Sequence, residues 1–232
     1  MDRTSVPESG AKLKLVEAAE ALFAERGFES VSVRDITKKA AMNIASVNYH
    51  FGSRDGLVAA VMTRYITPIN EERIVRLDAL ERRWSGKSVP IEEVLEAFVR
   101  PMVTQIRRSE LSERLFLKLV GRMFGEQGGA MPPVMVEQFK VIVARFVKTL
   151  SKSLPGLPPD EIIWRLHFVI GAMCFAMCQE DTLQTISQGV SGNPSVETTL
   201  ARFTRFAAAG LRNGLENGDA VVAKGPQATF DF

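Results

Sequence analysis

Two short amphipathic segments, joined by a turn of only a few residues, constrain the fold of this chain more than any other feature. Ser32 followed by Asp35 is a capping-box pattern that begins one helix. Asn43 is a favourable N-cap for the next helix, and Gly52 ends it. A helix pair joined so tightly is typical of the helix-turn-helix, in which the second helix enters the major groove of DNA.

The spacing of apolar residues assigns an inner and an outer face to this helix pair. The inward positions are expected to form a small core with Leu22 and Phe23 of a preceding helix, which Gly27 ends. Those inward positions are Val33, Ile36, Ala40, Val47 and Phe51.

The outward positions of the second short helix carry side chains that suit a DNA groove. Ser46 and Asn48 can hydrogen-bond base edges, and Asn pairs bidentately with adenine. Tyr49 and His50 can donate to phosphates and fix the register. Basic residues surround the same face: Arg34, Lys38, Lys39 and Arg54.

Net charge alone gives no indication of a nucleic-acid partner. The chain has 29 Lys and Arg against 27 Asp and Glu, a formal charge of +2. The charge is nevertheless segregated. Residues 32–54 contain four basic residues and one acidic residue, whereas residues 13–31 contain two basic residues and four acidic ones. Because phosphates respond to the local field, the basic segment coincides with the expected DNA-reading surface.

The rest of the chain also follows helical periodicity. A long helix is expected from Arg54, with Leu57, Val61 and Tyr65 on its buried stripe and Pro68 as a kink. Five more helices are expected at 91–107, 111–125, 133–153, 159–180 and 195–215, separated by Gly and Pro punctuation. No alternating strand pattern is present, so the fold class is all-α. Residues 125–133 are expected to form a mobile loop, and 217–232 a loose tail.

Composition excludes several other classes. Two cysteines, Cys174 and Cys178, cannot form a disulfide framework or a four-ligand zinc site, and in an apolar helix face they are expected to be inert core thiols. The longest apolar run, 168–178, is broken by Gly171 and is too short to span a bilayer. The first ten residues are polar, so a cytoplasmic location is expected.

An enzyme is the first alternative function, and the sequence does not favour it. The two histidines, His50 and His167, lie in different parts of the chain. No Gly-rich phosphate loop, metal-ligand spacing or nucleophile elbow is present. We therefore expect no catalytic residue, no cofactor and no metal. A helical protein-interaction module without DNA binding is the second alternative.

Three motifs give the N-terminal part a specific resemblance. Residues 18–28 read AAEALFAERGF, residues 32–36 read SVRDI, and residues 47–54 read VNYHFGSR. In their order and spacing these motifs resemble the TetR family of bacterial transcriptional regulators, over 13–61. The resemblance implies an all-helical homodimer that binds a palindromic operator in double-stranded DNA, usually as a repressor released by a small ligand. It also implies a DNA-binding domain at 9–56 and a ligand-binding and dimerisation domain at 57–216.

The resemblance assigns roles by position. Arg34 would reach a base or a phosphate from the first helix of the motif, and Tyr49, His50 and Arg54 would hold phosphates. The residues at or near base edges would be Asn43, Ile44, Ala45, Ser46 and Asn48.

Two positions depart from the family pattern. Ala41 stands in the turn where the family usually has Gly, so that residue either avoids a positive φ or costs about 1 kcal/mol. Asn48 replaces a common Tyr, so base specificity does not transfer from relatives.

A second resemblance concerns the ligand. Residues 158–172, PPDEIIWRLHFVIGA, together with 48–53 and 116–121, resemble the branch of the family that responds to long-chain fatty acids and controls β-oxidation genes. It implies a small apolar effector, a fatty acid or acyl thioester, in a tunnel. The expected lining is Phe98, Met102, Ile106, Leu119, Met123, Phe139, Phe146 and Met173.

A carboxylate head group needs a cationic donor, and the candidates are Arg122, Arg145, Arg165 and His167. Core packing is the alternative role for the Met and Phe residues, and a satisfied core or interface residue is the alternative for His167. A regulator of an efflux or catabolic operon that senses an unrelated hydrophobic or aromatic compound is the alternative function within the family.

Dimer contacts are expected from two helices. The segment 195–215 places Gly210 and Gly214 where another helix can approach closely, and 159–180 is apolar around much of its circumference. Paired with their symmetry mates, these helices would form a four-helix interface that spaces two recognition helices about one DNA turn apart.

Overall fold

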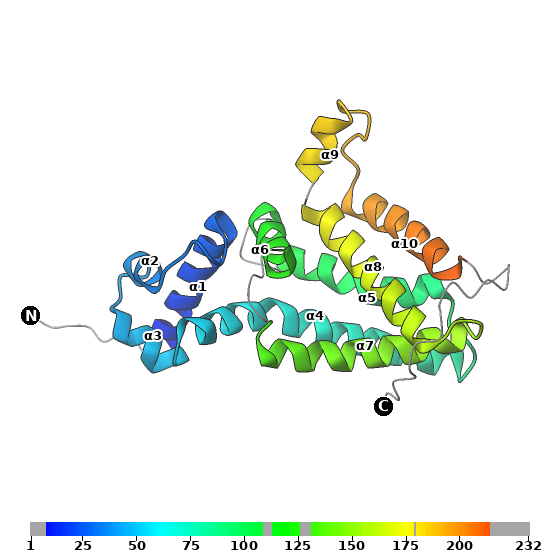
Figure 1. The fold of residues 1–232 in the computed structure, drawn as a ribbon, viewed down its shortest axis with the longest axis horizontal. Coiled ribbons are helices and arrows are strands. Elements are labelled where there is room, and N and C mark those ends of the chain that lie inside the picture. The colour runs from blue at the N-terminus through cyan, green and yellow to red at the C-terminus, as the bar shows by residue number, and fades with distance from the viewer. Residues whose placement is uncertain (1–7, 109–112, 126–130, 179, 214–232) are drawn as a thin grey trace, which may run out of the picture. The chain divides into compact units, whose positions relative to one another are not determined.

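The computed structural model describes residues 8–108, 113–125, 131–178 and 180–213, and within these ranges the chain is all helical (Figure 1). This confirms the expected fold class. The tail at 217–232 and most of the loop at 125–133 lie outside the described residues. The helices are α1 (Glu8–Arg26), α2 (Val33–Lys39), α3 (Ile44–Phe51), α4 (Arg54–Trp84), α5 (Ile91–Arg108), α6 (Glu113–Gly125), α7 (Pro133–Ser153), α8 (Pro159–Cys178), α9 (Glu180–Ile186) and α10 (Val196–Arg212).

The expected helix at 159–180 corresponds to α8, and residue 179, which separates α8 from α9, lies outside the described residues. Pro68 lies inside α4, which runs from Arg54 to Trp84.

The chain divides into two compact units. The first unit comprises 1–69, 104–138 and 174–180, and the second comprises 70–103, 139–173 and 181–232. The boundary between the units falls within α4, α5, α7 and α8, so each of these helices contributes residues to both. Among the described residues, no helix has the length and apolarity needed to cross a membrane.

Side-chain caps fix the beginnings of α2 and α3. The Ser32 hydroxyl accepts from the Asp35 amide at 3.2 Å, and the Asp35 carboxylate accepts from the Ser32 amide at 2.9 Å, which confirms the capping box. The Asn43 side chain accepts from the Ser46 amide and hydroxyl, both at 2.9 Å. Both helix starts are therefore encoded by residues within one helical turn.

The turn between α2 and α3 is a Schellman motif. The Met42 amide donates to the Thr37 carbonyl at 2.8 Å, and the Ala41 amide donates to the Lys38 carbonyl at 3.3 Å. This places Ala41 at φ 53°, in the left-handed region that favours glycine. Ala41 therefore does not avoid a positive φ, and this conformation costs about 1 kcal/mol.

The core of the first unit surrounds this turn. Phe23, Ile36 and Val47 are fully buried, and Phe23 packs against Phe28 with ring centroids 4.7 Å apart. Val33, Ala40 and Phe51 were expected in the same core but are only half-buried. Each of the three lies at a helix end, where fewer neighbours cover a side chain: Val33 begins α2, Ala40 is its C-cap, and Phe51 ends α3.

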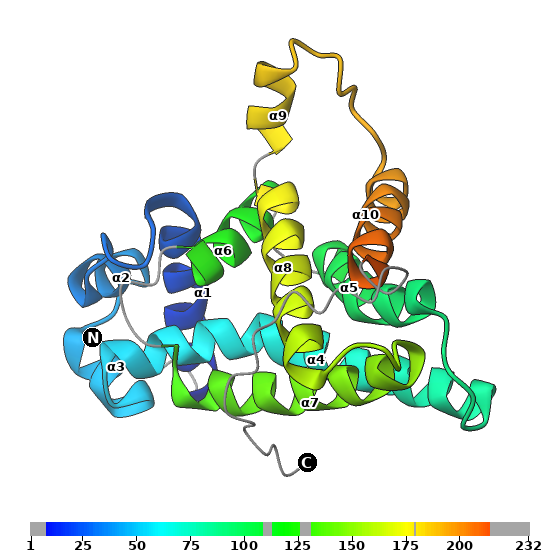
Figure 2. The same cartoon turned by 45° about the vertical axis from the view of Figure 1, so that its right-hand side comes forward.

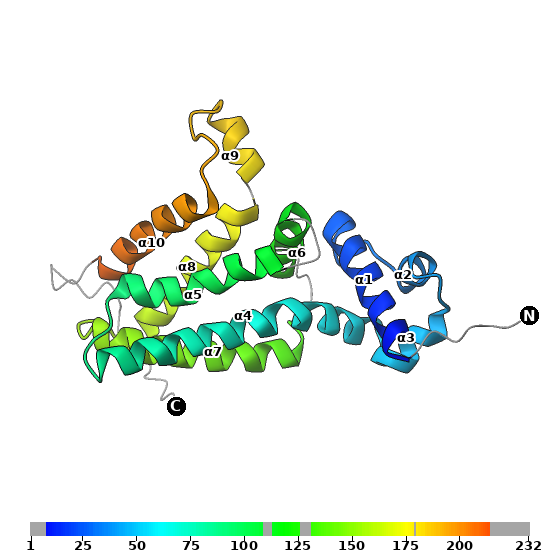
Figure 3. The same cartoon turned by 180° about the vertical axis from the view of Figure 1, so that it is seen from behind.

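The second unit packs α7 alongside α4, as Figures 1 to 3 show from three directions. The Thr149 hydroxyl donates to the Glu81 carboxylate at 2.7 Å, and Arg145 binds both Asp78 and Glu81. Arg145 was expected to be a candidate for a ligand head group. It instead bridges two carboxylates on α4, which stabilise its charge and raise its pKa.

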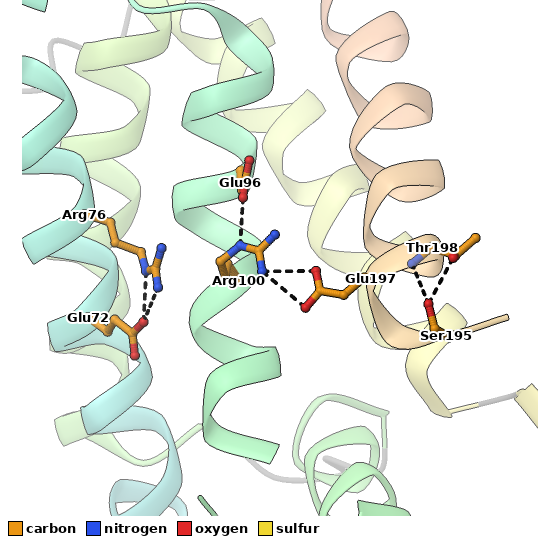
Figure 4. Close-up of polar contacts among 7 residues, drawn as sticks. All are labelled: Glu72, Arg76, Glu96, Arg100, Ser195, Glu197 and Thr198. Atoms are coloured by element: carbon orange, nitrogen blue, oxygen red, sulfur yellow. Dashed lines mark hydrogen bonds and ion pairs between the residues drawn. The ribbon is translucent and has the colours of Figure 1, made fainter. Parts of the chain in front are cut away.

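Helix α10 lies along α5 and is fixed there by charge (Figures 2 and 4). Arg100 contacts Glu96 on its own helix and Glu197 at 3.1 Å, near the start of α10. Arg212, in the last turn of α10, forms two 2.6 Å hydrogen bonds with Glu92. The two pairs set the helices antiparallel and fix their register. Ser195 caps α10 by accepting from the Thr198 amide.

The strained turn generates a stability prediction. Ala41→Gly should raise the free energy of unfolding by up to about 1 kcal/mol, because relief of the left-handed strain exceeds the added entropy of the unfolded chain. The neighbouring Ala40, at φ −76°, provides the matched control. Ala40→Gly should lower stability by roughly 0.5–1 kcal/mol. Urea denaturation followed by circular dichroism measures both, and a loss of stability in Ala41→Gly would contradict the strain.

Candidate nucleic-acid interface

Helix α3 presents its polar side chains to solvent. The Tyr49 residue is 73% exposed, and Asn48 is also exposed, while Ser46 and His50 are half-buried. Ile44, Ala45 and Asn43 complete the exposed N-terminal end of the helix. The expected outward residues therefore do face outward, and α3 has the exposure that a recognition helix needs.

Aromatic and capping contacts hold two pairs of these side chains. The Tyr49 ring meets the His50 ring edge-on, with centroids 4.9 Å apart. The Asn43 side-chain oxygen is held by Ser46, so both residues are ordered at the helix start. Ordered side chains lose less conformational entropy when they contact a ligand.

Arg54, an expected phosphate contact, has a structural role that the sequence reasoning missed. Its guanidinium donates to the carbonyl of Phe28 and, at 3.2 Å, to the carbonyl of Val31. It thereby attaches the start of α4 to the segment between α1 and α2. The residues involved are more than twenty positions apart, so no local sequence pattern indicates this contact.

Gly56 is a second residue that sequence reasoning missed. A Cβ atom at this position would lie 2.0 Å from the Phe51 carbonyl oxygen, at the end of α3. Gly52 at φ 73° turns the chain between the two helices, and the Ser53 hydroxyl accepts from the Gly56 amide at 3.0 Å. This close approach fixes the angle between the axes of α3 and α4. The only signal in the sequence is a Gly in the first turn of a helix.

The basic side chains of α2 are exposed, while its acidic residue, Asp35, stays ionised and pairs with Arg26. Arg34, Lys38 and Lys39 face solvent. The capping hydrogen bonds from Ser32, more than any charge partner, lower the pKa of Asp35, and Arg26 lies 3.7 Å away as an ion pair. The surface around α2 and α3 therefore carries a net positive field, which attracts phosphates.

Comparison with known proteins places this geometry in a family. Residues 15–61 match the family described as "Bacterial regulatory proteins, tetR family", and residues 96–210 match "Tetracyclin repressor-like, C-terminal domain". The chain belongs to the TetR family. The N-terminal motifs indicated the same family.

The curated TetR-family relatives match only the N-terminal part. A probable HTH-type transcriptional regulator, YttP of Bacillus subtilis, is 37% identical over 54 residues, 23% of this chain and 26% of YttP. The HTH-type transcriptional repressor Rv3405c of Mycobacterium tuberculosis is 40% identical over 63 residues, 26% of this chain and 34% of the relative. The repressor KstR2 of Rhodococcus jostii is 34% identical over 59 residues, 25% of this chain and 29% of KstR2. The chain thus matches about a quarter to a third of each relative's length.

Solved TetR-like structures share the fold over nearly the whole chain. The hemolysin II transcriptional regulator HlyIIR has a TM-score of 0.55 and 16% identity, over 86% of this chain and 97% of that one. A TetR-like transcriptional regulator from Rhodococcus sp. RHA1 has a TM-score of 0.53 and 16% identity, over 92% of this chain and all of that one.

Within the first unit of this TetR-family chain, a buried polar junction joins α1, α4 and α6. Glu20 of α1 is buried and lies 3.1 Å from Arg64 of α4. Tyr65 hydrogen-bonds the same carboxylate, and its ring meets Phe116 of α6 edge-on at 5.3 Å. Burial raises the pKa of Glu20, and the attraction of Arg64 and the Tyr65 hydrogen bond only partly offset it.

The expected ligand-lining residues are divided between the two units. Ile106, Leu119 and Met123 are buried in the first unit. In the second unit Phe98, Met102, Phe146 and Met173 are buried, and Phe139 is half-buried.

The expected head-group donors do not lie among these buried residues. Arg122 is half-buried on α6 and reaches the Glu25 carbonyl at 3.4 Å. Arg165 donates to the carbonyls of Leu211 and Asn213 at 2.8 and 2.7 Å, and so holds the C-terminal end of α10. His167 lies on the exposed face of α8 beside Trp164, in a position unlike a buried ligand contact.

The buried Glu20 gives a pH prediction. A raised pKa means that the folded chain binds this proton more tightly than the unfolded chain does. Its contribution to stability is therefore present below the ordinary value of 4.5 and is lost as pH rises through the raised value. Glu20→Gln removes this titration, so its melting temperature relative to the natural chain should increase from pH 4 to pH 7.

The exposed Glu25, on the same helix, provides the control. The melting temperature of Glu25→Gln, relative to the natural chain, should change much less over this range. Thermal melts at both pH values measure the differences. A relative melting temperature of Glu20→Gln that falls with pH would show that the ionised carboxylate is favoured in the folded chain.

Proposed function

We propose that this TetR-family regulator is a repressor that binds a palindromic operator as a homodimer through α3 and is released by a small apolar acyl ligand. The observation that carries the DNA-binding part is the exposed polar face of α3, fixed at both ends by caps and backbone contacts. Repression is supported by Rv3405c and KstR2, which are named as transcriptional repressors.

The proposed contacts follow from exposure and chemistry. Ser46 and Asn48 would read base edges, with Ile44 and Ala45 forming apolar contacts beside them. Tyr49 and His50 would donate to phosphates, and Arg34 would reach the backbone or a base from α2. Arg54 would contribute chiefly by holding α4 in place, since two carbonyls already accept from its guanidinium.

The proposed dimer would use α8 and α10. Trp164 and Phe168 of α8 are 58% and 63% exposed, and Phe206 of α10 is 71% exposed. Large aromatic side chains exposed together favour an interface over a solvated surface. Gly171 and Gly210 are also open, with nothing within 4 Å of a Cβ placed there, so a partner helix would meet little obstruction.

The acyl ligand is supported by the buried Phe and Met side chains of the second unit, which adapt to flexible chains. An unrelated hydrophobic or aromatic compound would fit the same residue types, so it remains the alternative effector. Release requires that the ligand favour a dimer whose two recognition helices no longer match adjacent grooves.

The test of DNA binding is a gel shift with DNA from upstream of the chain's own gene. Asn48→Ala and Tyr49→Ala should each weaken operator binding by about 5–150-fold, the effect of losing a contact of roughly 1–3 kcal/mol. Ile186 is an exposed residue outside α3, so Ile186→Ala is the control. This variant should bind the operator as tightly as the natural chain does.

The same assay tests the effector. Palmitoyl-CoA or palmitate should abolish the shift, whereas shifts that neither compound affects would overturn the acyl assignment. Unchanged affinity of both α3 variants in a folded dimer would overturn the assignment of the recognition helix.

The test of the dimer is analytical ultracentrifugation. Phe168→Glu places a charge in the proposed interface and should convert the protein to a monomer while the helical content stays the same. Val141→Glu, at an exposed apolar position of α7, is the matched control and should remain a dimer. A monomeric natural chain, or a dimeric Phe168→Glu variant, would contradict the proposed interface.

A further inference from the structure

The second turn of α1 carries a lysine that lies against the end of α3. Lys12 is exposed, and its Nζ lies over the Phe51 ring, 5.8 Å from the ring centroid. Because Phe51 is the last residue of α3, the ammonium group stands at the C-terminal end of that helix. Both helices belong to the first unit, and Figures 1 and 3 show the start of α1 beside α3.

The same end of α3 carries the two side chains that the proposed function assigns to phosphates. The His50 ring adjoins the Phe51 ring at 6.2 Å and the Tyr49 ring at 4.9 Å, both measured between centroids. Tyr49 is exposed and His50 is half-buried. Lys12 therefore places a positive charge next to groups that can donate to the DNA backbone.

The charge of α1 is segregated along the helix. Residues 9–16 contain two lysines and no acidic residue, whereas residues 17–25 contain three glutamates and no basic residue. Among the described residues, Lys12 forms no ion pair. The positive surface of α2 and α3 therefore continues onto the start of α1, and its field attracts an external anion.

The Phe51 ring limits the positions that the Lys12 ammonium group takes. A cation within about 6 Å of an aromatic centroid is attracted to the face of the ring. A lysine side chain is flexible, so it loses conformational entropy when it binds a partner. Because the ring already restricts Lys12 at the end of α3, less of that entropy remains to be lost on binding.

We propose that Lys12 binds a phosphate of the DNA backbone beside the groove that α3 enters, with the Phe51 ring holding the ammonium group in position. This inference rests on the proposed DNA binding through α3, and it extends the interface to α1. Since phosphates carry no base identity, the contact would strengthen binding to any duplex and leave base selection to Ser46 and Asn48.

A purely structural contact is the competing explanation. A lysine that only joins α1 to α3 through the Phe51 ring would contribute to stability, and its loss would leave the salt dependence of DNA binding unchanged. A lysine that binds a phosphate displaces counterions from the DNA, so its loss makes binding less sensitive to salt. The salt dependence therefore distinguishes the two explanations.

The experiment measures binding of the full chain to two labelled duplexes by fluorescence anisotropy, between about 0.05 and 0.2 M KCl. One duplex is the fragment from upstream of the chain's own gene, and the other has the same composition in scrambled order. Lys12→Gln should reduce the slope of log affinity against log salt by about 0.9 for each subunit, on both duplexes. Asn48→Ala should weaken binding to the upstream fragment alone.

Lys14→Gln is the matched control, because Lys14 is also exposed but lies about 200° around α1 from Lys12. It removes the same charge and should leave the slope unchanged. Lys12→Arg keeps a cation at the position and should retain the natural slope. An unchanged slope in Lys12→Gln, or an equal reduction in Lys14→Gln, would overturn the inference.

A second measurement requires no variant, in case Lys12→Gln fails to fold. The natural chain is acetylated briefly with and without the upstream fragment, and the modified lysines are quantified by mass spectrometry. Bound DNA should protect Lys12, whereas Lys14 should react as it does in the free chain. Equal acetylation of Lys12 with and without DNA would overturn the inference.

The two duplexes separate this inference from the proposed function. Failure of the natural chain to bind either duplex would overturn both. Preferential binding of the upstream fragment, with a slope that Lys12→Gln leaves unchanged, would overturn this inference alone. Equal binding of both duplexes, with a slope that depends on Lys12, would overturn the operator-specific repressor and support the phosphate contact.

Discussion

The orientation of α3 depends on backbone groups satisfied within a few residues of each of its ends. At the start, Asn43 caps the helix, and at the end the Phe51 carbonyl lies against Gly56 of α4. Arg54 then joins the start of α4 to the carbonyls of Phe28 and Val31. The Asn43 cap and the Gly56 contact are local, and Arg54 adds a contact that is distant in sequence. The angle of the recognition helix is therefore fixed before any DNA is present, and binding loses less entropy.

Each unit also contains a buried charged side chain, Glu20 in the first and Arg73 in the second, and their surroundings differ. Glu20 faces Arg64 and Tyr65, so its cost of burial is partly offset within the junction of α1, α4 and α6. Arg73 lies over the Phe98 ring, and two of its hydrogen bonds go to the Phe98 carbonyl and the Asn70 side-chain oxygen. A carboxylate that titrates makes stability depend on pH, whereas a guanidinium stays charged and adds no such dependence.

Local features of this chain could be predicted from sequence, whereas long-range partners could not. The caps at Ser32 and Asn43 and the face of α3 depend on residues within one or two turns, and they were predicted correctly. Ala41 was recognised as a departure, but its positive φ required the backbone. Arg145 and Arg165 were expected as head-group candidates, and their contacts with α4 carboxylates and α10 carbonyls could not be predicted because those partners lie 64 or 67 and 45 to 48 residues away. A basic side chain in an apolar helix has the same pattern whether it binds a ligand or a neighbouring helix.

The net charge of +2 does not show where the charged residues of this chain lie or what they contact. On α2 the capping box holds the one acidic residue beside Arg26, which offsets its charge, and the exposed basic side chains remain near α3. On α5 and α10 opposite charges at both ends set the register of the two helices, although exposed pairs add little stability. Phe206 on the same helix is 71% exposed, so it is available to the proposed dimer partner while these pairs hold α10 on α5. The effect of these charges therefore depends mainly on where each side chain lies, and the net charge of the whole sequence does not reveal it.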